Sequence, residues 1–119
     1  MNTKSVSIPE RAQVVIVGGG IIGCSVAYHL TKLGWKDILL LERDQLTSGT
    51  TWHAAGLIVS GLLSDETSAD IFTYGRDLYS HLEQETGLAT GFKSVGYVQV
   101  ACNQERLEEM RRSAAFMRT

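Results

Sequence analysis

The sequence has 119 residues, with 13 acidic and 11 basic side chains and a formal net charge of −2. This near balance gives no reason to expect nucleic acid or an anionic membrane surface as a partner. No apolar stretch approaches the roughly 20 residues of a membrane-spanning helix, so we expect no membrane insertion. Cys24 and Cys102 are far apart and form no CxxC pair, which indicates neither a metal site nor a redox motif.

Residues 1–12 are expected to form an N-terminal extension. They contain no apolar segment of the kind that a secretory signal carries, and they are too lightly basic for a transit peptide. A cytoplasmic location is therefore the prediction from these residues.

A strand, a helix and a second strand are predicted around a glycine-rich turn. Residues 13–17 are apolar and β-branched, which suits a strand buried on both faces. Apolar residues recur at helical spacing over 21–33, and Gly34 is a good helix stop. Residues 37–41 form a second apolar strand that ends at Glu42. This order is typical of the first βαβ unit of a dinucleotide-binding domain.

The turn has the spacing GxGxxG, with its glycines at Gly18, Gly20 and Gly23. The first glycine permits the tight turn, the second lets the backbone approach a pyrophosphate, and the third lets helix and strand pack closely. The positive amino end of the helix then faces the phosphates. Glu42 follows by about 20 residues, where a carboxylate can accept hydrogen bonds from ribose hydroxyls. This context favours a bound dinucleotide over a glycine turn without a ligand.

The segment after Glu42 is a polar, turn-rich loop over 43–52. It leaves the carboxyl end of a strand, which is the side where ligands bind in open α/β sheets. A run of small residues around His53 follows, and small side chains allow the backbone to come close to a flat ring system.

The second half of the chain predicts helices and a strand. Helical spacing indicates a helix over 66–86, with Ser64 or Asp65 as its N-cap. Alternating apolar residues over 92–102 predict a strand, paired in a hairpin or a second sheet. Asn103 is expected to cap a last helix. The fold class is thus α/β: a Rossmann-like βαβ unit followed by helices and a short strand or hairpin.

The predicted domain is incomplete. Two parallel strands with one crossover helix cannot close a sheet, and their exposed edges would invite association. The sequence also stops inside an apparent helix, at residues 116–119. We therefore expect residues 13–119 to be the truncated N-terminal part of a larger domain, which would not fold alone.

Two stretches resemble the N-terminal FAD-binding region of the dimethylglycine dehydrogenase and sarcosine dehydrogenase family, within the D-amino-acid-oxidase-like class of flavoproteins. The first reads VVIVGGGIIGCSVAYHLTKLGWKDILLLER and then LTSGTTWHAAGL, and the second reads LEQETGLATGFKSVGYVQVACNQERLEEMRR. Many nucleotide-binding folds share the glycine spacing, whereas SGTTWHAAGL is far more specific and carries the assignment. The resemblance covers nearly all of the chain from Gln13 onward.

The resemblance implies that the chain binds FAD, and that His53 is bonded covalently to the 8α carbon of the flavin. By family position, the backbone of Ile21 and Ile22 contacts the pyrophosphate, and Glu42 and Arg43 lie near the adenosine ribose. Arg43 could instead mark a preference for a 2′-phosphate, but Glu42 argues against that. A wrap along the flavin is assigned to Gly49, Thr50, Thr51, Trp52, His53, Ala54, Ala55, Gly56 and Leu57.

The resemblance also implies an FAD-dependent amine dehydrogenase or oxidase that acts on the CH–NH bond of an N-methyl amine such as sarcosine or dimethylglycine. Hydride would pass from the N-methyl carbon to flavin N5, giving an iminium that water hydrolyses or tetrahydrofolate captures. An electron-transfer flavoprotein or oxygen would take the electrons. A eukaryotic member would lie in the mitochondrial matrix. No catalytic acid or base is identified in these residues.

Two other functions are open. The first is a non-catalytic relative, similar to the pyruvate dehydrogenase phosphatase regulatory subunit, that keeps the fold as an interaction protein. The presence of His53 in its motif speaks weakly against it. The second is an NAD-dependent dehydrogenase with the same glycine spacing, which would leave LTSGTTWHAAGL without a purpose.

Overall fold

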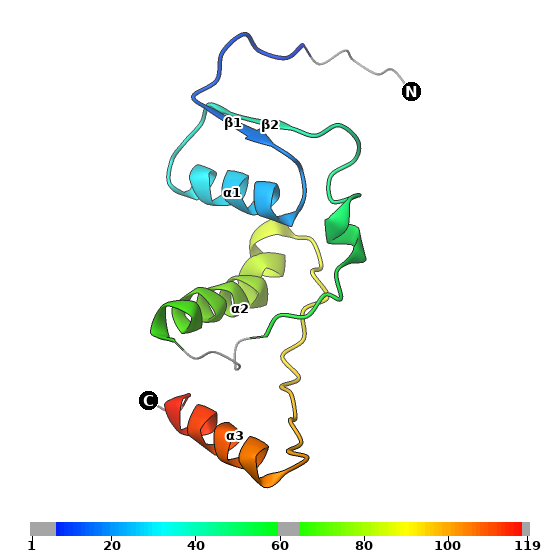
Figure 1. Ribbon diagram of the computed structural model, residues 1–119. Coiled ribbons are helices and arrows are strands. Elements are labelled where there is room, and N and C mark those ends of the chain that lie inside the picture. The colour runs from blue at the N-terminus through cyan, green and yellow to red at the C-terminus, as the bar shows by residue number, and fades with distance from the viewer. Residues whose placement is uncertain (1–6, 60–64, 118–119) are drawn as a thin grey trace. The chain divides into compact units, whose positions relative to one another are not determined.

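The computed structural model describes residues 7–59 and 65–117, and the chain divides into two compact units, Met1–Ala55 and Gly56–Thr119. The first unit contains β1 (Val14–Val17), α1 (Ile21–Lys32), β2 (Ile38–Leu41) and the 3-10 turn η1 (Thr50–His53) (Figure 1). The second contains α2 (Glu66–Thr86) and α3 (Gln104–Phe116). The predicted N-terminal extension is described from residue 7 onward. Within the described residues, no helix combines the length and apolarity needed to cross a bilayer.

The two strands of the first unit form a parallel pair, as the sequence predicts. Val14 lies opposite Ile38, and this register continues to the ends of both strands. Each strand begins one residue later than expected. The residues before them are still paired, because the Gln13 amide donates to the carboxylate of Asp37 at 3.0 Å. The predicted βαβ unit is thereby confirmed, with its strands at Val14–Val17 and Ile38–Leu41.

Two backbone hydrogen bonds that reach back to the last turn close the carboxyl end of α1. Gly34 has a φ of +90°, which lets its amide donate to the carbonyl of Thr31 and the amide of Trp35 donate to the carbonyl of Leu30, each at 3.0 Å. This is the Schellman arrangement, and it satisfies carbonyls that the end of a helix would otherwise leave unpaired. The predicted helix stop is confirmed.

The prediction that the first strand is buried on both faces is wrong for the described residues. Helix α1 packs on the face that carries Ile16, whereas the side chains of Val15 and Val17 on the opposite face are 51% and 83% exposed. No hydrophobic side chain among residues 7–59 and 65–117 is fully buried. A sheet of two strands with one helix covers a single face, and burying the other needs a second layer.

Helix α2 begins and ends where the sequence indicates, and α3 begins there; α3 ends at Phe116 with Met117 as its C-cap, although the sequence indicated a helix that still continues at residues 116–119. The Asp65 carboxylate accepts a hydrogen bond from the Ser68 amide at 2.8 Å, and the Asn103 side chain accepts one from the Arg106 amide at 2.8 Å. Both are N-caps that satisfy an otherwise unpaired donor of the first turn. Gly87 ends α2. The alternative cap, Ser64, lies outside the described residues.

The strand predicted over 92–102 does not form, and this part of the chain is irregular. Residues 93–100 are all exposed, including Val95 at 85% and Val98 at 90%. A strand needs a neighbour to pair its amides and carbonyls, and the described part of the chain provides none here. The segment begins with a ring contact, where Phe92 lies 6.3 Å from Tyr79 of α2 between centroids.

Candidate functional site

The glycine turn between β1 and α1 has a backbone that only glycine permits. Gly18 has a φ of +107°, a region that residues with a Cβ rarely enter. A Cβ on Gly23 would overlap the carbonyl oxygen of Gly18. The first helical turn therefore lies directly against the end of β1, with its amide groups at the carboxyl end of the sheet. This is the place and form of the phosphate cradle in dinucleotide-binding folds.

Glu42 folds back onto this turn from the end of β2. Its Oε2 accepts a hydrogen bond from the Gly19 amide at 2.7 Å, and its Oε1 accepts one from the Asp44 amide at 3.1 Å. These bonds, the Gly19 bond first, hold the pKa of the Glu42 carboxyl below its usual value. The carboxylate is thus ionised, and of its roughly four lone-pair positions two remain for further donors.

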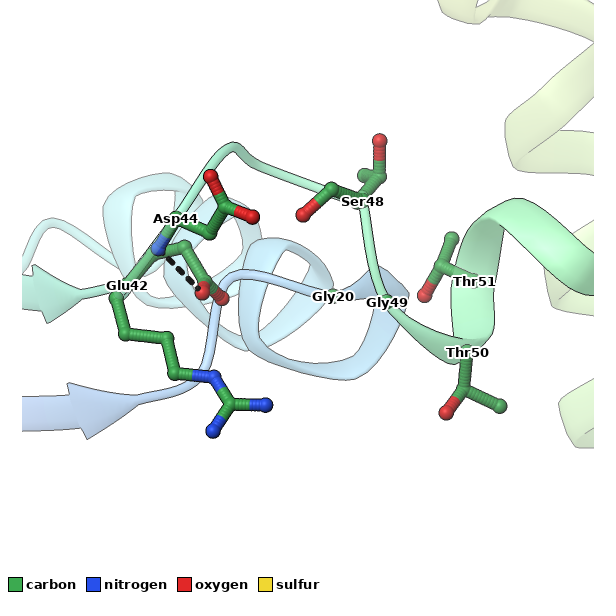
Figure 2. A pocket seen from close by; sticks show the side chains of 9 residues that line it. Gly20, Glu42, Asp44, Ser48, Gly49, Thr50 and Thr51 are labelled. Carbon is green, nitrogen blue, oxygen red and sulfur yellow. Dashed lines mark hydrogen bonds between the residues drawn. The ribbon is translucent and has the colours of Figure 1, made fainter.

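The loop after Glu42 is fastened to the glycine turn at two more points. The Thr47 amide donates to the carbonyl of Gly19 at 2.8 Å, although Thr47 has a φ of +64°, an unfavourable value for a β-branched residue. Further along, the hydroxyl of Thr51 accepts a hydrogen bond from the Ile21 amide at 2.9 Å. Figure 2 shows this hydroxyl on the side of Gly20, at the start of α1. The loop therefore follows the rim of the turn.

An open pocket of about 370 Å³ lies between the turn and this loop. Its volume is within the range of small-ligand sites, roughly 300 to 1,000 Å³. Figure 2 shows the loop residues that surround it, with hydroxyls and carboxylates directed to different sides. The lining residues are Gly20, Glu42, Arg43, Asp44, Thr47, Ser48, Gly49, Thr50 and Thr51. Two carboxylates beside one arginine oppose a 2′-phosphate and suit the hydroxyls of an unphosphorylated ribose.

His53 is the last residue of η1 and is exposed. Its Nδ1 lies 3.0 Å from the carbonyl oxygen of Gly49. A carbonyl oxygen only accepts hydrogen bonds, so Nδ1 must carry the proton, and in the neutral ring the lone pair is on Nε2. His53 does not line the pocket itself. It follows Thr51, the residue that contacts α1, by two positions, on the glycine-turn side of the sheet.

The structure brings most of the predicted site residues into one unit. The three glycines, Ile21, Ile22, Glu42, Arg43 and the segment 49–55 all belong to the first unit. Trp52, Ala54 and Ala55 are exposed there. Gly56 and Leu57 belong to the second unit, where they line another open pocket of about 360 Å³ together with Arg76 and residues 91–97. An anion bound at Ile21 would have to share the Ile21 amide, which already donates a hydrogen bond to the Thr51 hydroxyl.

Four residues of the site are missing from the sequence-based prediction. Gly19 exchanges hydrogen bonds with both Glu42 and Thr47, and the other three, Asp44, Thr47 and Ser48, line the pocket. All three pocket residues lie in the polar loop 43–52. The position of that loop after a strand end was the available signal, because ligand contacts concentrate at such loops.

Known proteins are similar to this sequence over most of its length. Human mitochondrial sarcosine dehydrogenase is 45% identical over 106 residues, and the 4-methylaminobutanoate oxidase (formaldehyde-forming) of Paenarthrobacter nicotinovorans is 48% identical over 103 residues. Mouse mitochondrial pyruvate dehydrogenase phosphatase regulatory subunit is 46% identical over 108 residues. These alignments cover 88%, 87% and 91% of this chain, but only 11%, 12% and 12% of the relatives. The chain therefore spans about an eighth of their length.

A solved structure and a family model agree on the fold. The L-amino acid deaminase from Proteus vulgaris matches 97% of this chain and 26% of its own, with a TM-score of 0.83 at 23% identity. The model of the family described as FAD dependent oxidoreductase matches residues 13–119. With the glycine turn, the acidic strand end and the pocket beside them, this match is decisive: the chain belongs to the FAD dependent oxidoreductase family and forms an N-terminal part of its fold.

Proposed function

We propose that this chain is the FAD-binding part of an oxidoreductase that oxidises an N-methyl amine. The observation that carries the proposal is the joining of the glycine turn to the loop before His53, through Glu42, Thr47 and Thr51. A dinucleotide fold needs only the turn and the acid. The loop that is hydrogen-bonded to the glycine turn and the histidine that follows it in sequence are additional features, and both suit a flavin held beside them.

The chain's own groups fit the adenosine end of FAD. Glu42 has lone pairs left for the two ribose hydroxyls, and its ionised state strengthens such bonds. The amino end of α1 presents backbone amides and a positive dipole to the pyrophosphate. Arg43 at the pocket wall adds a positive charge beside the two carboxylates. Gly18 supplies the positive φ of the turn, and Gly23 lets α1 begin directly against the end of β1.

The substrate class rests on what the relatives share. Sarcosine and 4-methylaminobutanoate, named in two of the relatives, are both amino acids with a methyl group on nitrogen. Bound FAD supplies a two-electron acceptor for the hydride of a carbon beside that nitrogen. The chain's part is to bind and orient this acceptor. The groups that bind the amine or move its proton are not assigned to residues 1–119.

His53 is proposed as the site of covalent attachment. Its Nε2 lone pair would supply the C–N bond to the 8-methyl carbon of bound FAD, with one C–H bond of the methyl group and the Nδ1–H bond broken. The two protons and two electrons of this oxidation would pass to molecular oxygen, giving hydrogen peroxide. His53 thereby prevents loss of the cofactor. The electron-withdrawing substituent also makes the ring a better electron acceptor.

A variant pair tests the attachment. Acid precipitation of the purified full-length protein should leave the yellow colour and flavin fluorescence in the pellet, and His53→Ala should release them to the supernatant. His81→Ala is the matched control, because the His81 Nδ1 contacts the carbonyl of Asp77 at 2.8 Å, four residues earlier, as His53 contacts Gly49. Colour entirely in the supernatant for the unmodified protein would refute the bond at His53.

The mouse relative supports a second function. Its name is that of a regulatory subunit, and its 46% identity is equal to that of the enzymes within a few per cent. Anaerobic titration with sarcosine, dimethylglycine and 4-methylaminobutanoate separates the two functions. Bleaching of the flavin by one of them supports the oxidoreductase. A bound flavin that none of them reduces supports the regulatory subunit.

The electron acceptor and the location follow from the same relatives. One is named a dehydrogenase and one an oxidase, so an electron-transfer flavoprotein and oxygen are both candidate electron acceptors. Reoxidation of the amine-reduced protein in air, measured against reoxidation by an electron-transfer flavoprotein, distinguishes them. Two of the relatives are mitochondrial by name, which supports the mitochondrial matrix for a eukaryotic source, while the cytoplasm stays the prediction for a bacterial one.

A further inference from the structure

We propose that Thr51 is a positioning residue: its side-chain hydroxyl holds the His53-bearing turn at the amino end of α1. The consequence for covalent attachment rests on the function proposed above. The contact itself does not, because it joins two backbone segments of the first unit.

The geometry singles out Thr51 among the residues near His53. The Ile21 amide donates to its Oγ1 at 2.9 Å, across 30 positions of sequence. The side chain is half-buried, while Thr50 and Trp52 on either side of it are exposed. Figure 2 shows the Thr51 hydroxyl directed toward Gly20 and the Thr50 hydroxyl directed away. Thr51 is thus the last fastening point of the loop before His53.

The turn that carries His53 needs such a fastening point. η1 has four residues, and a 3-10 turn of this length has poor hydrogen-bond geometry of its own. Its internal bonds join Trp52 to Gly49 and Ala54 to Thr51, so they set its local shape and not its place. The hydroxyl also satisfies one of the helix amides that lack a partner within α1. Removing it frees the turn and leaves that amide without its acceptor.

Attachment of a flavin at His53 depends on this placement. Bond formation requires the nucleophile within about 3 to 3.5 Å of the carbon it attacks, and a displacement of 1 Å can cost a factor of about 100 in rate. Loss of the hydrogen bond between Ile21 and Thr51, which we call the anchor, should therefore slow the attachment of the flavin more than it weakens its binding. Noncovalent binding retains the Glu42 carboxylate and its bond to Gly19, and the Ile21 amide that Thr51 releases is available to the pyrophosphate.

Three variants of the purified full-length protein test the anchor. Thr51→Val removes the hydroxyl and keeps the branched shape, and Thr51→Ser keeps the hydroxyl. Thr31→Val is the matched control, since the Thr31 hydroxyl donates to the carbonyl of Tyr28 within α1. Two quantities are measured: the rate at which added FAD becomes acid-stable, against total flavin bound, and hydrogen exchange of the Ile21 amide and of residues 50–55.

Loss of the anchor should change both quantities in Thr51→Val and neither quantity in the control variants. Thr51→Val should form acid-stable flavin at least about tenfold more slowly for each flavin bound, because the nucleophile is displaced. Its Ile21 amide should exchange about fivefold to tenfold faster. Thr51→Ser and Thr31→Val should match the unmodified protein. Unchanged exchange in Thr51→Val would overturn the proposal, as would an attachment rate equal to that of the unmodified protein.

Failure of the proposed function has a different signature. If the unmodified protein never forms acid-stable flavin, the bond at His53 is refuted, and the exchange measurement alone then decides the anchor. Faster exchange confined to Ile21 and 50–55 supports it under those conditions too. If Thr51→Val and Thr51→Ser lose flavin and exchange protection equally, the side chain acts by bulk and not by its hydroxyl, which also overturns the proposal.

Discussion

Within each of the two units of this chain, the hydrogen bonds span a different range of sequence. In the first, the Gly19–Glu42 and Ile21–Thr51 hydrogen bonds join residues 23 and 30 positions apart. In the second, the caps of α2 and α3 join residues three positions apart. Local bonds define where a helix starts. The long-range ones bring the glycine turn, Glu42 and the following loop to one pocket, so most of the predicted cofactor-binding residues lie in the first unit.

The difference has a physical origin in glycine and in one carboxylate. Gly23 lets α1 approach β1 so closely that a Cβ has no room, and the buried Gly19 lies beneath the side chain of Glu42. Close backbone approach exposes amides, and the ionised Glu42 satisfies one of them. In α2, by contrast, Gly75 has no atom within 4 Å of the place where a Cβ would be. The same residue type therefore serves two different purposes.

Replacing each of these glycines by alanine should give the largest effect and should break the comparison most directly. Gly23→Ala forces a Cβ into the Gly18 carbonyl, so we expect a loss of about 3 kcal/mol in the free energy of unfolding and of most bound flavin. Gly75→Ala adds a methyl group to open space in a helix and should stabilise by about 0.5 to 1 kcal/mol.

Thermal melting and the flavin-to-protein absorbance ratio of the purified protein measure both effects. Opposite signs for the two substitutions support the distinction between the units. A Gly23→Ala protein that melts and binds flavin like the original would show that the first helical turn can shift away from β1, and that the close approach is not required.

The second effect is a pH dependence that originates at Glu42. Its carboxyl has a pKa below the usual value of 4.5, chiefly because the Gly19 amide donates to it and next because the Asp44 amide does. The folded pKa is depressed, so the stabilisation is fully present above pH 4.5 and is lost as the pH falls through the folded pKa. The melting temperature should therefore fall more steeply below pH 4.5 in the original protein than in Glu42→Gln.

The control for this prediction is the comparison at neutral pH. There Glu42→Gln should be the less stable protein, since a neutral amide is a weaker acceptor for two backbone amides than a carboxylate is. It should also bind FAD about tenfold more weakly, because a neutral amide is a weaker acceptor for the ribose hydroxyls than a carboxylate is. Parallel melting curves at all pH values would mean that the Glu42 bonds do not contribute to stability.

The smallest effect is expected in the second unit. Asn103→Ala removes the N-cap that accepts from the Arg106 amide, at a cost of about 1 kcal/mol. Asn103→Asp keeps an acceptor and is the matched control. Because this cap is local, the flavin content should not change, and fraying should be confined to α3 in hydrogen exchange. A loss of flavin in Asn103→Ala alone would show that the two units are coupled.

Much of the fold follows from the sequence because its signals are local. The glycine spacing, the apolar runs and the caps at Asp65 and Asn103 predict β1, α1, β2, α2 and α3 to within a residue or two. The strand over 92–102 was predicted wrongly. Alternation of apolar residues reports a preference for two faces, whereas a strand also requires a partner, which a pattern within one segment does not reveal.

The site divides in the same way. Sequence by itself determined that a turn of three glycines, an acid at a strand end and a histidine in a run of small residues occur in this order, since each is a local chemical requirement. Tertiary structure alone decided that Glu42 accepts from Gly19 and that Thr51 accepts from Ile21. Those partners are far apart in the chain, and only the parallel pairing of β1 with β2 brings the second strand's end and its loop to the glycine turn.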